Sequence, residues 1–188
     1  MAAAGPILLL ITALSLLFCA LATTPVPASI EVPQEHPCKL QQTVHAKGYQ
    51  YYRFNGTAWL FFNASARLYN SEKQQVGHHF YLAEADAQGG QPTWESLPSK
   101  KSDAVPYSRV TCKPVSKEIV DQDSIQWVLL QSTQCKGDKT YFGDVAFVQR
   151  INTKLGLAPT TTKGAREGEV KKSPYSADYK FYVSEANH

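Results

Sequence analysis

The fold class is decided by residues 49–62, which read YQYYRFNGTAWLFF. Aromatic residues dominate both halves of this stretch, and aromatic-rich runs are typical of β-strands. An Asn-Gly pair separates the halves and favours a type I′ turn, because both central residues of that turn need positive φ. We therefore predict a β-hairpin whose two strands meet at Asn55 and Gly56.

Further strand-like segments follow along the chain, and turn residues separate them at short intervals. Residues 125–130 are apolar on both faces, which is typical of a central strand. No window has a convincing helical period. The other predicted strands cover residues 65–69, 76–82, 107–115, 125–132, 145–152 and 179–183. This pattern predicts an all-β fold, an antiparallel β-sandwich or barrel with long loops and little helix.

The N-terminal segment has the features of an export signal. Residues 6–22 carry no charge, contain two apolar runs and end in the small-x-small sequence Ala-Leu-Ala. A membrane anchor is the alternative, but the run is short and no Lys or Arg follows it directly. We expect a signal peptide at 1–22, an extended Pro-rich lead-in at 23–43 and a single β-rich domain at 44–188 with a polar loop at 154–174. The protein should then be secreted, extracellular or in a cell wall, with no membrane span.

The net charge gives little indication of a partner. The formal charge is +3 at pH 7, and Lys and Arg are spread along the sequence rather than grouped with aromatic residues. Nucleic-acid-binding domains usually carry a concentrated basic patch. We therefore expect no nucleic-acid partner, and instead an extracellular glycan or small molecule.

Three cysteines remain after removal of the signal peptide, which takes Cys19 with it. An oxidising compartment favours one disulfide and leaves one thiol. We predict the pair Cys112–Cys135, because both residues lie beside predicted strands, whereas Cys38 lies in the Pro-rich lead-in. The alternative is that all three are reduced and buried. No Cys or His spacing typical of a zinc site is present, so we expect no metal.

Two N-glycosylation sequons are present, Asn-Gly-Thr beginning at Asn55 and Asn-Ala-Ser beginning at Asn63. Asn55 falls on the predicted hairpin turn, where a glycan fits. Asn63 shares strand parity with Trp59 and Phe61, so a glycan there needs a β-bulge if that face is buried. Asn55 and Asn63 are therefore both candidates, and parity argues against the second.

A pair of histidines, His78 and His79, lies in a predicted strand. Neighbouring strand residues point to opposite faces, so at most one of them faces any site. The alternative is one surface histidine and one that is hydrogen-bonded in the core. Trp94 and Glu95 follow a Gly-Gly turn and could stack on a sugar and act as acid or base. The alternative there is a buried Trp94 beside an exposed Glu95.

Arg150 is a third candidate for binding, because it lies inside an otherwise apolar strand. A buried arginine would need a carboxylate partner such as Glu95 or Asp178. The alternative is an arginine that points outward. The sequence has no G-x-S-x-G, no H-E-x-x-H and no phosphate-binding loop.

Several segments resemble those of a known family, in the same order, over residues 44–183. They lie at 66–69, 76–79, 92–95, 125–130, 145–153, 156–159 and 175–182. The family comprises secreted fungal and bacterial proteins, is catalogued as a domain of unknown function, and has fungal members often labelled malate dehydrogenase. Leu155 stands where that family usually has Gly, and an insertion covers 83–90. The resemblance implies secretion and a β-rich fold, and it implies no established activity.

Three functions stay open from the sequence. The first is a non-enzymatic extracellular or cell-surface module that binds a glycan or small molecule at the mouth or face of the β-structure. The second is an extracellular hydrolase or lyase that uses Glu95 with His78 or His79. The third is a metal-binding module, which needs at least three converging ligands. An NAD-dependent dehydrogenase is excluded, since no glycine-rich turn opens a helix within a βαβ unit, and we expect no cofactor.

Overall fold

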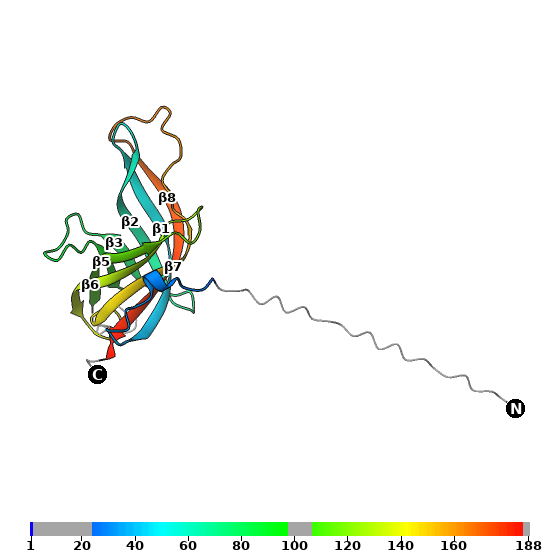
Figure 1. Cartoon of the computed structure of the whole chain (residues 1–188), viewed down its shortest axis with the longest axis vertical. Helices are drawn as coiled ribbons and strands as arrows, with labels where there is room; N and C mark the ends of the chain where they lie inside the picture. Colours follow the sequence, from blue (N-terminus) through cyan, green and yellow to red (C-terminus); the bar gives the residue numbers. More distant parts are fainter. Residues whose placement is uncertain (2–23, 98–106, 186–188) are drawn as a thin grey trace.

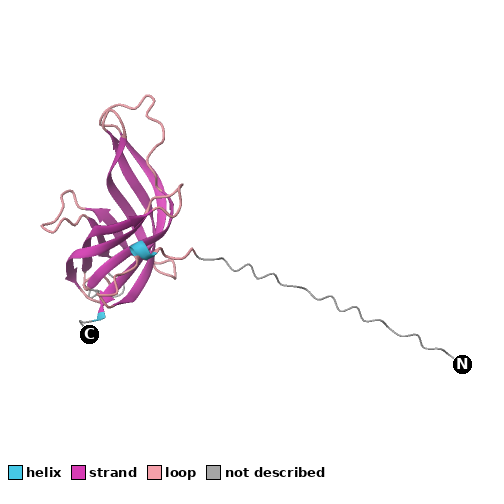
Figure 2. Cartoon of the chain, viewed as in Figure 1, coloured by secondary structure: helices cyan, strands magenta, loops and turns pink. Residues whose placement is uncertain are grey.

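The computed structural model describes Met1 and residues 24–97 and 107–185, and these residues form one closed antiparallel barrel. Each strand pairs with its neighbours in the sequence, and β1 pairs with β8 to close the barrel (Figures 1 and 2). The strands are β1 (Cys38–Phe54), β2 (Trp59–Tyr69), β3 (Gln75–Tyr81), β4 (Pro92–Ser96), β5 (Ser108–Glu118), β6 (Trp127–Gly137), β7 (Val145–Leu155) and β8 (Val170–Ser184). The predicted all-β fold is confirmed, with the barrel as its architecture.

The chain before β1 contains a short 3-10 helix, η1 (Ala28–Ile30). Most of the predicted signal peptide falls at 2–23, outside the described residues. Among the described residues, no helix has the length and apolar character needed to cross a membrane.

The hairpin predicted at residues 49–62 is present, but its predicted turn type is wrong. Phe54 pairs with Trp59, and residues 55–58 connect the two strands. The Asn55 side-chain oxygen accepts hydrogen bonds from the backbone N–H groups of Thr57 and Ala58, at 3.0 and 2.8 Å. Within this connection only Gly56 has positive φ, at 90°. The side chain of Asn55 therefore closes the turn, and a second left-handed residue is not needed.

A β-bulge in β2 reverses the strand parity expected for Asn63. Tyr51 pairs with Asn63 whereas Tyr52 pairs with Phe61, so Phe62 is the extra residue. Before the bulge Trp59 is buried, and after it Ala64 is buried. Asn63 therefore lies on the outer face, and the parity argument against its glycosylation no longer holds. Glycosylation of Asn55 and Asn63 stays a prediction.

The barrel interior is closed at one end by an aromatic side chain. Phe142, in the β6–β7 connection, is fully buried and its ring centroid lies 4.7 Å from that of Phe181 on β8. Its backbone N–H donates a hydrogen bond to the Ser108 hydroxyl at 3.2 Å. Phe142 therefore fills the interior at this end of the described barrel.

A strap formed by residues 26–38 covers the outside of β6 and β7. Ile30 is completely buried there in a cluster with Trp127, Leu129, Phe147 and Ile151. The strap explains why residues 125–130 are apolar on both faces, since one face fills the barrel and the other faces the strap. The predicted lead-in at 23–43 is thus packed rather than merely extended, and β1 begins within it at Cys38.

The long loop predicted at 154–174 is shorter, because β7 continues to Leu155 and β8 begins at Val170. Leu155 has φ of 60°, a conformation that favours glycine, which is the residue of the resembled family at this place. The loop packs against the inner face of the β1–β2 hairpin, where Trp59 donates its indole N–H to the Thr161 carbonyl at 2.9 Å. β4 is a strand that the sequence analysis did not predict.

The predicted Cys112–Cys135 disulfide is not present, since Cys38, Cys112 and Cys135 are all free thiols. The pairing of β5 with β6 gives the reason: Cys112 lies opposite Ser132, and Cys135 lies opposite Val110. The two cysteines share the barrel core without being direct cross-strand partners. Burial raises the pKa of the Cys112 thiol well above its usual value, which disfavours its reactive thiolate form.

We predict that Ile30→Ala lowers the free energy of unfolding by about 2–5 kcal/mol, because it empties the centre of the strap cluster. Urea denaturation followed by tryptophan fluorescence measures the change. Ile119→Ala is the matched control, since Ile119 is 53% exposed. Equal losses in the two variants would show that the strap does not stabilise the barrel.

Candidate functional site

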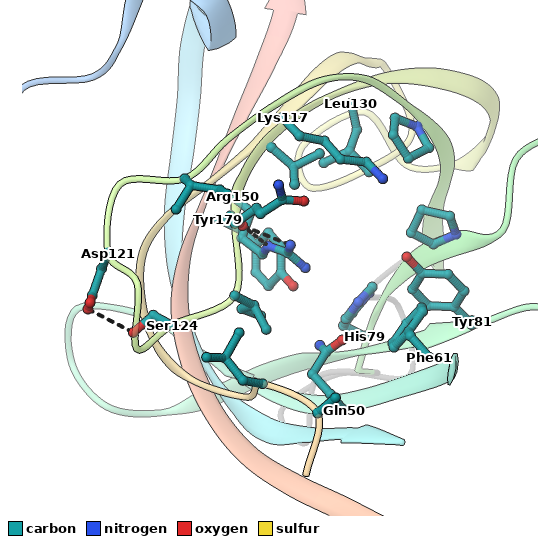
Figure 3. Close-up of a pocket in the computed structure, with 18 of the residues that line it drawn as sticks. Gln50, Phe61, His79, Tyr81, Lys117, Asp121, Ser124, Leu130, Arg150 and Tyr179 are labelled. Atoms are coloured by element: carbon teal, nitrogen blue, oxygen red, sulfur yellow. Dashed lines mark hydrogen bonds between the residues drawn. The ribbon is translucent and has the colours of Figure 1, made fainter. Parts of the chain in front are cut away.

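The open end of the barrel leads into a cavity of about 490 Å³ (Figure 3). Its wall contains residues from all eight strands, and its rim is formed by residues 119–126 and 157–158. The volume lies within the range of small-molecule sites, which are typically about 300–1,000 Å³. The cavity is therefore a site enclosed by the barrel itself.

His79 and Trp94 form part of the cavity wall as a stacked pair. Their ring centroids are 4.5 Å apart with an interplanar angle of 18°, and Tyr179 meets Trp94 edge-on at 5.1 Å. His79 Nδ1 lies 2.8 Å from the Thr93 carbonyl oxygen. A carbonyl can only accept, so Nδ1 carries the proton and Nε2 is left as an acceptor. Burial lowers the pKa of His79 to about 3, and the ring is therefore neutral at physiological pH.

Arg150 points into the cavity from β7 (Figure 3). Its Nε and Nη2 donate hydrogen bonds to the Gln126 carbonyl oxygen at 3.2 and 2.8 Å. No carboxylate of the described residues lies within ion-pair distance of its guanidinium. Neither partner considered from the sequence is available: Glu95 interacts with His78 and Arg109, and Asp178 interacts with His45 and Asn152.

Arg150 thus fits neither of the interpretations drawn from its sequence context. It is inward-facing, and the protein supplies it with a carbonyl oxygen rather than a counter-ion. Asp121 is the acidic residue of the rim, but Ser124 donates to it at 2.8 Å and Lys154 lies 3.8 Å from it. The guanidinium therefore brings an unbalanced positive charge into the mouth of the barrel.

Two further donors in the cavity wall have no acceptor among the described residues. They are Gln50 Nε2 and the indole N–H of Trp94, both buried. Buried polar atoms are normally hydrogen-bonded, so each unpaired donor calls for a physical explanation. Together with Arg150, they make the cavity rich in donors.

Tyrosine hydroxyls complete the polar lining. Tyr52, Tyr81 and Tyr179 line the cavity, and burial raises the pKa of all three phenols while the charge of Arg150 opposes that rise. The phenols therefore stay protonated and can donate hydrogen bonds. The Tyr52 hydroxyl already donates to the Gly156 carbonyl at 2.6 Å.

The barrel wall separates the remaining residues that the sequence singled out. His78 and Glu95 lie on the outer face, with His78 Nε2 at 3.5 Å from a Glu95 oxygen. Arg109 lies 3.8 Å from the other Glu95 oxygen, which also accepts a hydrogen bond from Tyr107 at 2.9 Å. His79 faces inward, so of the two predicted acid–base pairs only His78–Glu95 is in contact. Trp94 and Glu95 cannot act on one ligand.

The geometry does not support the metal-binding alternative. Within residues 24–97 and 107–185, no group of three or more His, Cys, Asp or Glu side chains is placed to hold a metal ion.

Sequence reasoning missed most of the cavity, whose residues are contributed by all eight strands. Gln50 and Tyr52 could have been found, because they share one strand parity with Phe54 in the predicted hairpin and that parity faces the interior. The rim residues at 119–126 and 157–158 lie in connections between strands, where no alternation indicates which side chains face the cavity.

The family described as Protein of unknown function (DUF3455) matches residues 33–183, from the strap to the last strand. No curated protein matches the chain, and no solved structure matches it either.

We predict that His79 makes stability depend on pH. Its pKa is about 3 in the folded protein and 6.5 when unperturbed, so below pH 6.5 the unfolded state binds a proton that the folded state does not. The free energy of unfolding should fall by up to about 1.4 kcal/mol for each pH unit between 6.5 and 4. The carboxylates with lowered pKa values titrate below this window.

Urea denaturation of the wild type and of His79→Gln at pH 8, 7, 5.5 and 4.5 measures this effect. Above pH 7 the free energies of unfolding of the two proteins should differ by a constant amount. Below pH 6 the free energy of unfolding of the wild type should fall more than that of the variant. A constant difference down to pH 4.5 would show that His79 binds a proton in the folded barrel.

Proposed function

The chain belongs to the family described as Protein of unknown function (DUF3455), and because that description assigns no activity, we propose a function from the geometry of the barrel. The protein is a binding module whose interior cavity holds a small molecule with an apolar or aromatic body and an anionic group. The observation that carries this proposal is the guanidinium of Arg150, which enters the cavity without a carboxylate partner.

An anion is the group that best complements Arg150. A partly desolvated guanidinium without a counter-ion is unfavourable, and a carboxylate or sulfonate would relieve that penalty through short, charge-assisted hydrogen bonds. Gln50 Nε2 and the Trp94 indole N–H offer further donors that lack acceptors in the described protein. An oxygen-rich group would therefore meet several donors at once.

The aromatic lining of the cavity indicates that the uncharged part of the ligand is apolar or aromatic. Tyr52, Phe61, Tyr81, Trp94 and Tyr179 all line the cavity. Such rings bury a large apolar area and favour stacked or edge-on contact with another ring. The enclosed volume supports a small molecule in this site rather than a polymer. Of the two ligand classes expected from the sequence, a glycan or a small molecule, the cavity therefore favours the small molecule.

The hydrolase or lyase alternative now depends on His78 and Glu95 alone. Their contact lies outside the barrel cavity, and Arg109 and Tyr107 already engage the carboxylate. This arrangement favours an ion-pair role for Glu95, and binding is the function that the geometry supports better.

We also propose that the protein is secreted and carries glycans on Asn55 and Asn63. Export is supported by the sequence of residues 1–22, and glycosylation by the exposed position of Asn55 and the bulge that turns Asn63 outward. Expression in a eukaryotic secretory host should give a medium-borne protein that begins at Thr23 and loses mass on treatment with an N-glycosidase. Asn55→Gln and Asn63→Gln should each remove one glycan, and a cell-retained protein with residues 1–22 intact would contradict secretion.

The binding proposal is tested with a pair of fluorescent probes that differ in one group. The anion 8-anilino-1-naphthalenesulfonate (ANS) combines an aromatic body with a sulfonate, and N-phenyl-1-naphthylamine has a similar body without charge. We expect Arg150→Gln to weaken ANS binding at least tenfold, which corresponds to about 1.4 kcal/mol, and to change binding of the neutral probe less than threefold.

Arg53→Gln is the control, because Arg53 lies on the outer face against Phe62, with its Cζ at 4.5 Å from the ring centroid. It should leave both affinities unchanged. If Arg150→Gln binds ANS as tightly as the wild type does, the cavity does not recognise an anion through Arg150 and the proposal fails.

A further inference from the structure

A second hollow lies on the outer wall of the barrel, and its lining comes from β1, β2, β3, β7 and β8. Its volume is about 1070 Å³, and its lining includes Lys47, Tyr49, Arg67, Tyr69, His78 and Phe80, all exposed or partly exposed. None of these six residues lines the interior cavity. The two linings share His79, and the six outward-facing residues line the outer hollow alone.

Three of these residues form a row of basic groups in register across the sheet. Lys47 on β1 lies opposite Arg67 on β2, and Arg67 lies opposite His78 on β3. Neighbouring strands are about 4.8 Å apart, so the row spans roughly 10 Å. Like charges directly opposite each other destabilise a sheet. An anion bound along the row would remove this repulsion.

The described residues supply a carboxylate to His78 but none to Lys47 or Arg67. Within the described parts of the chain, no carboxylate lies at ion-pair distance from Lys47 or Arg67. Glu95 continues the row on β4, but its two oxygens lie 3.5 Å from His78 and 3.8 Å from Arg109. Positive charge is therefore concentrated on the β1 and β2 side of the row.

Aromatic rings also line the hollow, among them Tyr49 and Phe80. Tyr49 is 39% exposed, and the Lys172 ammonium lies 4.6 Å from its ring centroid. The Phe80 ring centroid lies 5.7 Å from that of His78 and 5.3 Å from the Arg109 guanidinium carbon. An exposed ring offers an apolar face, and a tyrosine hydroxyl adds a donor and an acceptor. The hollow therefore combines charge, flat apolar surface and hydroxyl groups.

We propose that this hollow binds an acidic glycan. Carboxylates or sulfates of the glycan would bind Lys47 and Arg67, and its sugar rings would pack on Tyr49 and Phe80. The concave shape does not match a flat bilayer surface. The sequence pI of about 8.6 lies below the value above 9 that is typical of nucleic-acid-binding domains. The proposed secretion would expose the hollow to extracellular glycans.

The test compares two charge-matched double variants of the full-length secreted protein. Lys47→Gln/Arg67→Gln removes two cations of the row, and Lys39→Gln/Lys163→Gln removes two exposed cations outside the hollow. Isothermal titration at 0.15 M salt measures binding of a heparin-derived octasaccharide and a galacturonate octamer, with neutral dextran and a single-stranded DNA octamer as comparisons. ANS binding to each variant reports on the interior cavity and on folding.

We expect the wild type to bind at least one acidic oligosaccharide more tightly than the DNA and not to bind dextran. The row variant should weaken that binding at least tenfold, and the control variant should change it less than twofold. No binding of either acidic oligosaccharide, equal losses in both variants, or equally tight binding of DNA would overturn the proposal. The Arg150→Gln experiment tests the interior cavity with ANS, whereas this experiment tests the outer hollow with oligosaccharides, so failure of one proposal is distinguishable from failure of the other.

Discussion

The pairing of β1 with β8 is the contact on which the rest of the structure depends. It runs from Cys38 opposite Ser184 to Arg53 opposite Val170 and converts an eight-stranded sheet into a barrel. Closure satisfies the backbone groups that a free sheet edge would expose. It also creates an interior, and the two-residue period of each strand then assigns every side chain to the inside or the outside. Both proposed sites follow from that assignment.

The same alternation explains why neighbouring residues have different chemistry. His79 and Trp94 are stacked in the interior, whereas His78 and Glu95 are in contact on the outer wall. In each of the pairs His78–His79 and Trp94–Glu95, one side chain therefore points into the barrel and the other points outward. The two side chains of a pair cannot contact the same ligand. The interior histidine is desolvated and neutral, with a pKa lowered to about 3. One strand pair thus supplies an apolar, donor-rich wall to the cavity and a charged row to the outer surface.

The sequence allowed prediction of local features but not of features that depend on distant contacts. The hairpin at residues 49–62 and most strands were predictable, because aromatic runs and turn residues act over a few positions. A sandwich and a barrel share that local pattern, so closure was not predictable. The strap was missed because the burial of Ile30 requires β6 and β7 to be in place. The bulge at Phe62 was missed because no glycine marks it, and it reversed the expected orientation of Asn63.

The cations without a carboxylate partner at the two proposed sites differ in how strongly they indicate a bound ligand. Lys47 and Arg67 are exposed, and water and salt screen much of their repulsion, so the fold can tolerate the outer row at small cost. Arg150 is half-buried among aromatic side chains, where a charge loses solvation and the effective dielectric constant is lower. Leucine or methionine at position 150 would fill the mouth of the barrel without that penalty. A carbonyl oxygen from Gln126 offsets only part of it, because a neutral acceptor cannot balance a full charge. The described residues therefore give Arg150 no counter-ion, which makes the interior cavity the stronger physical indication of a bound ligand.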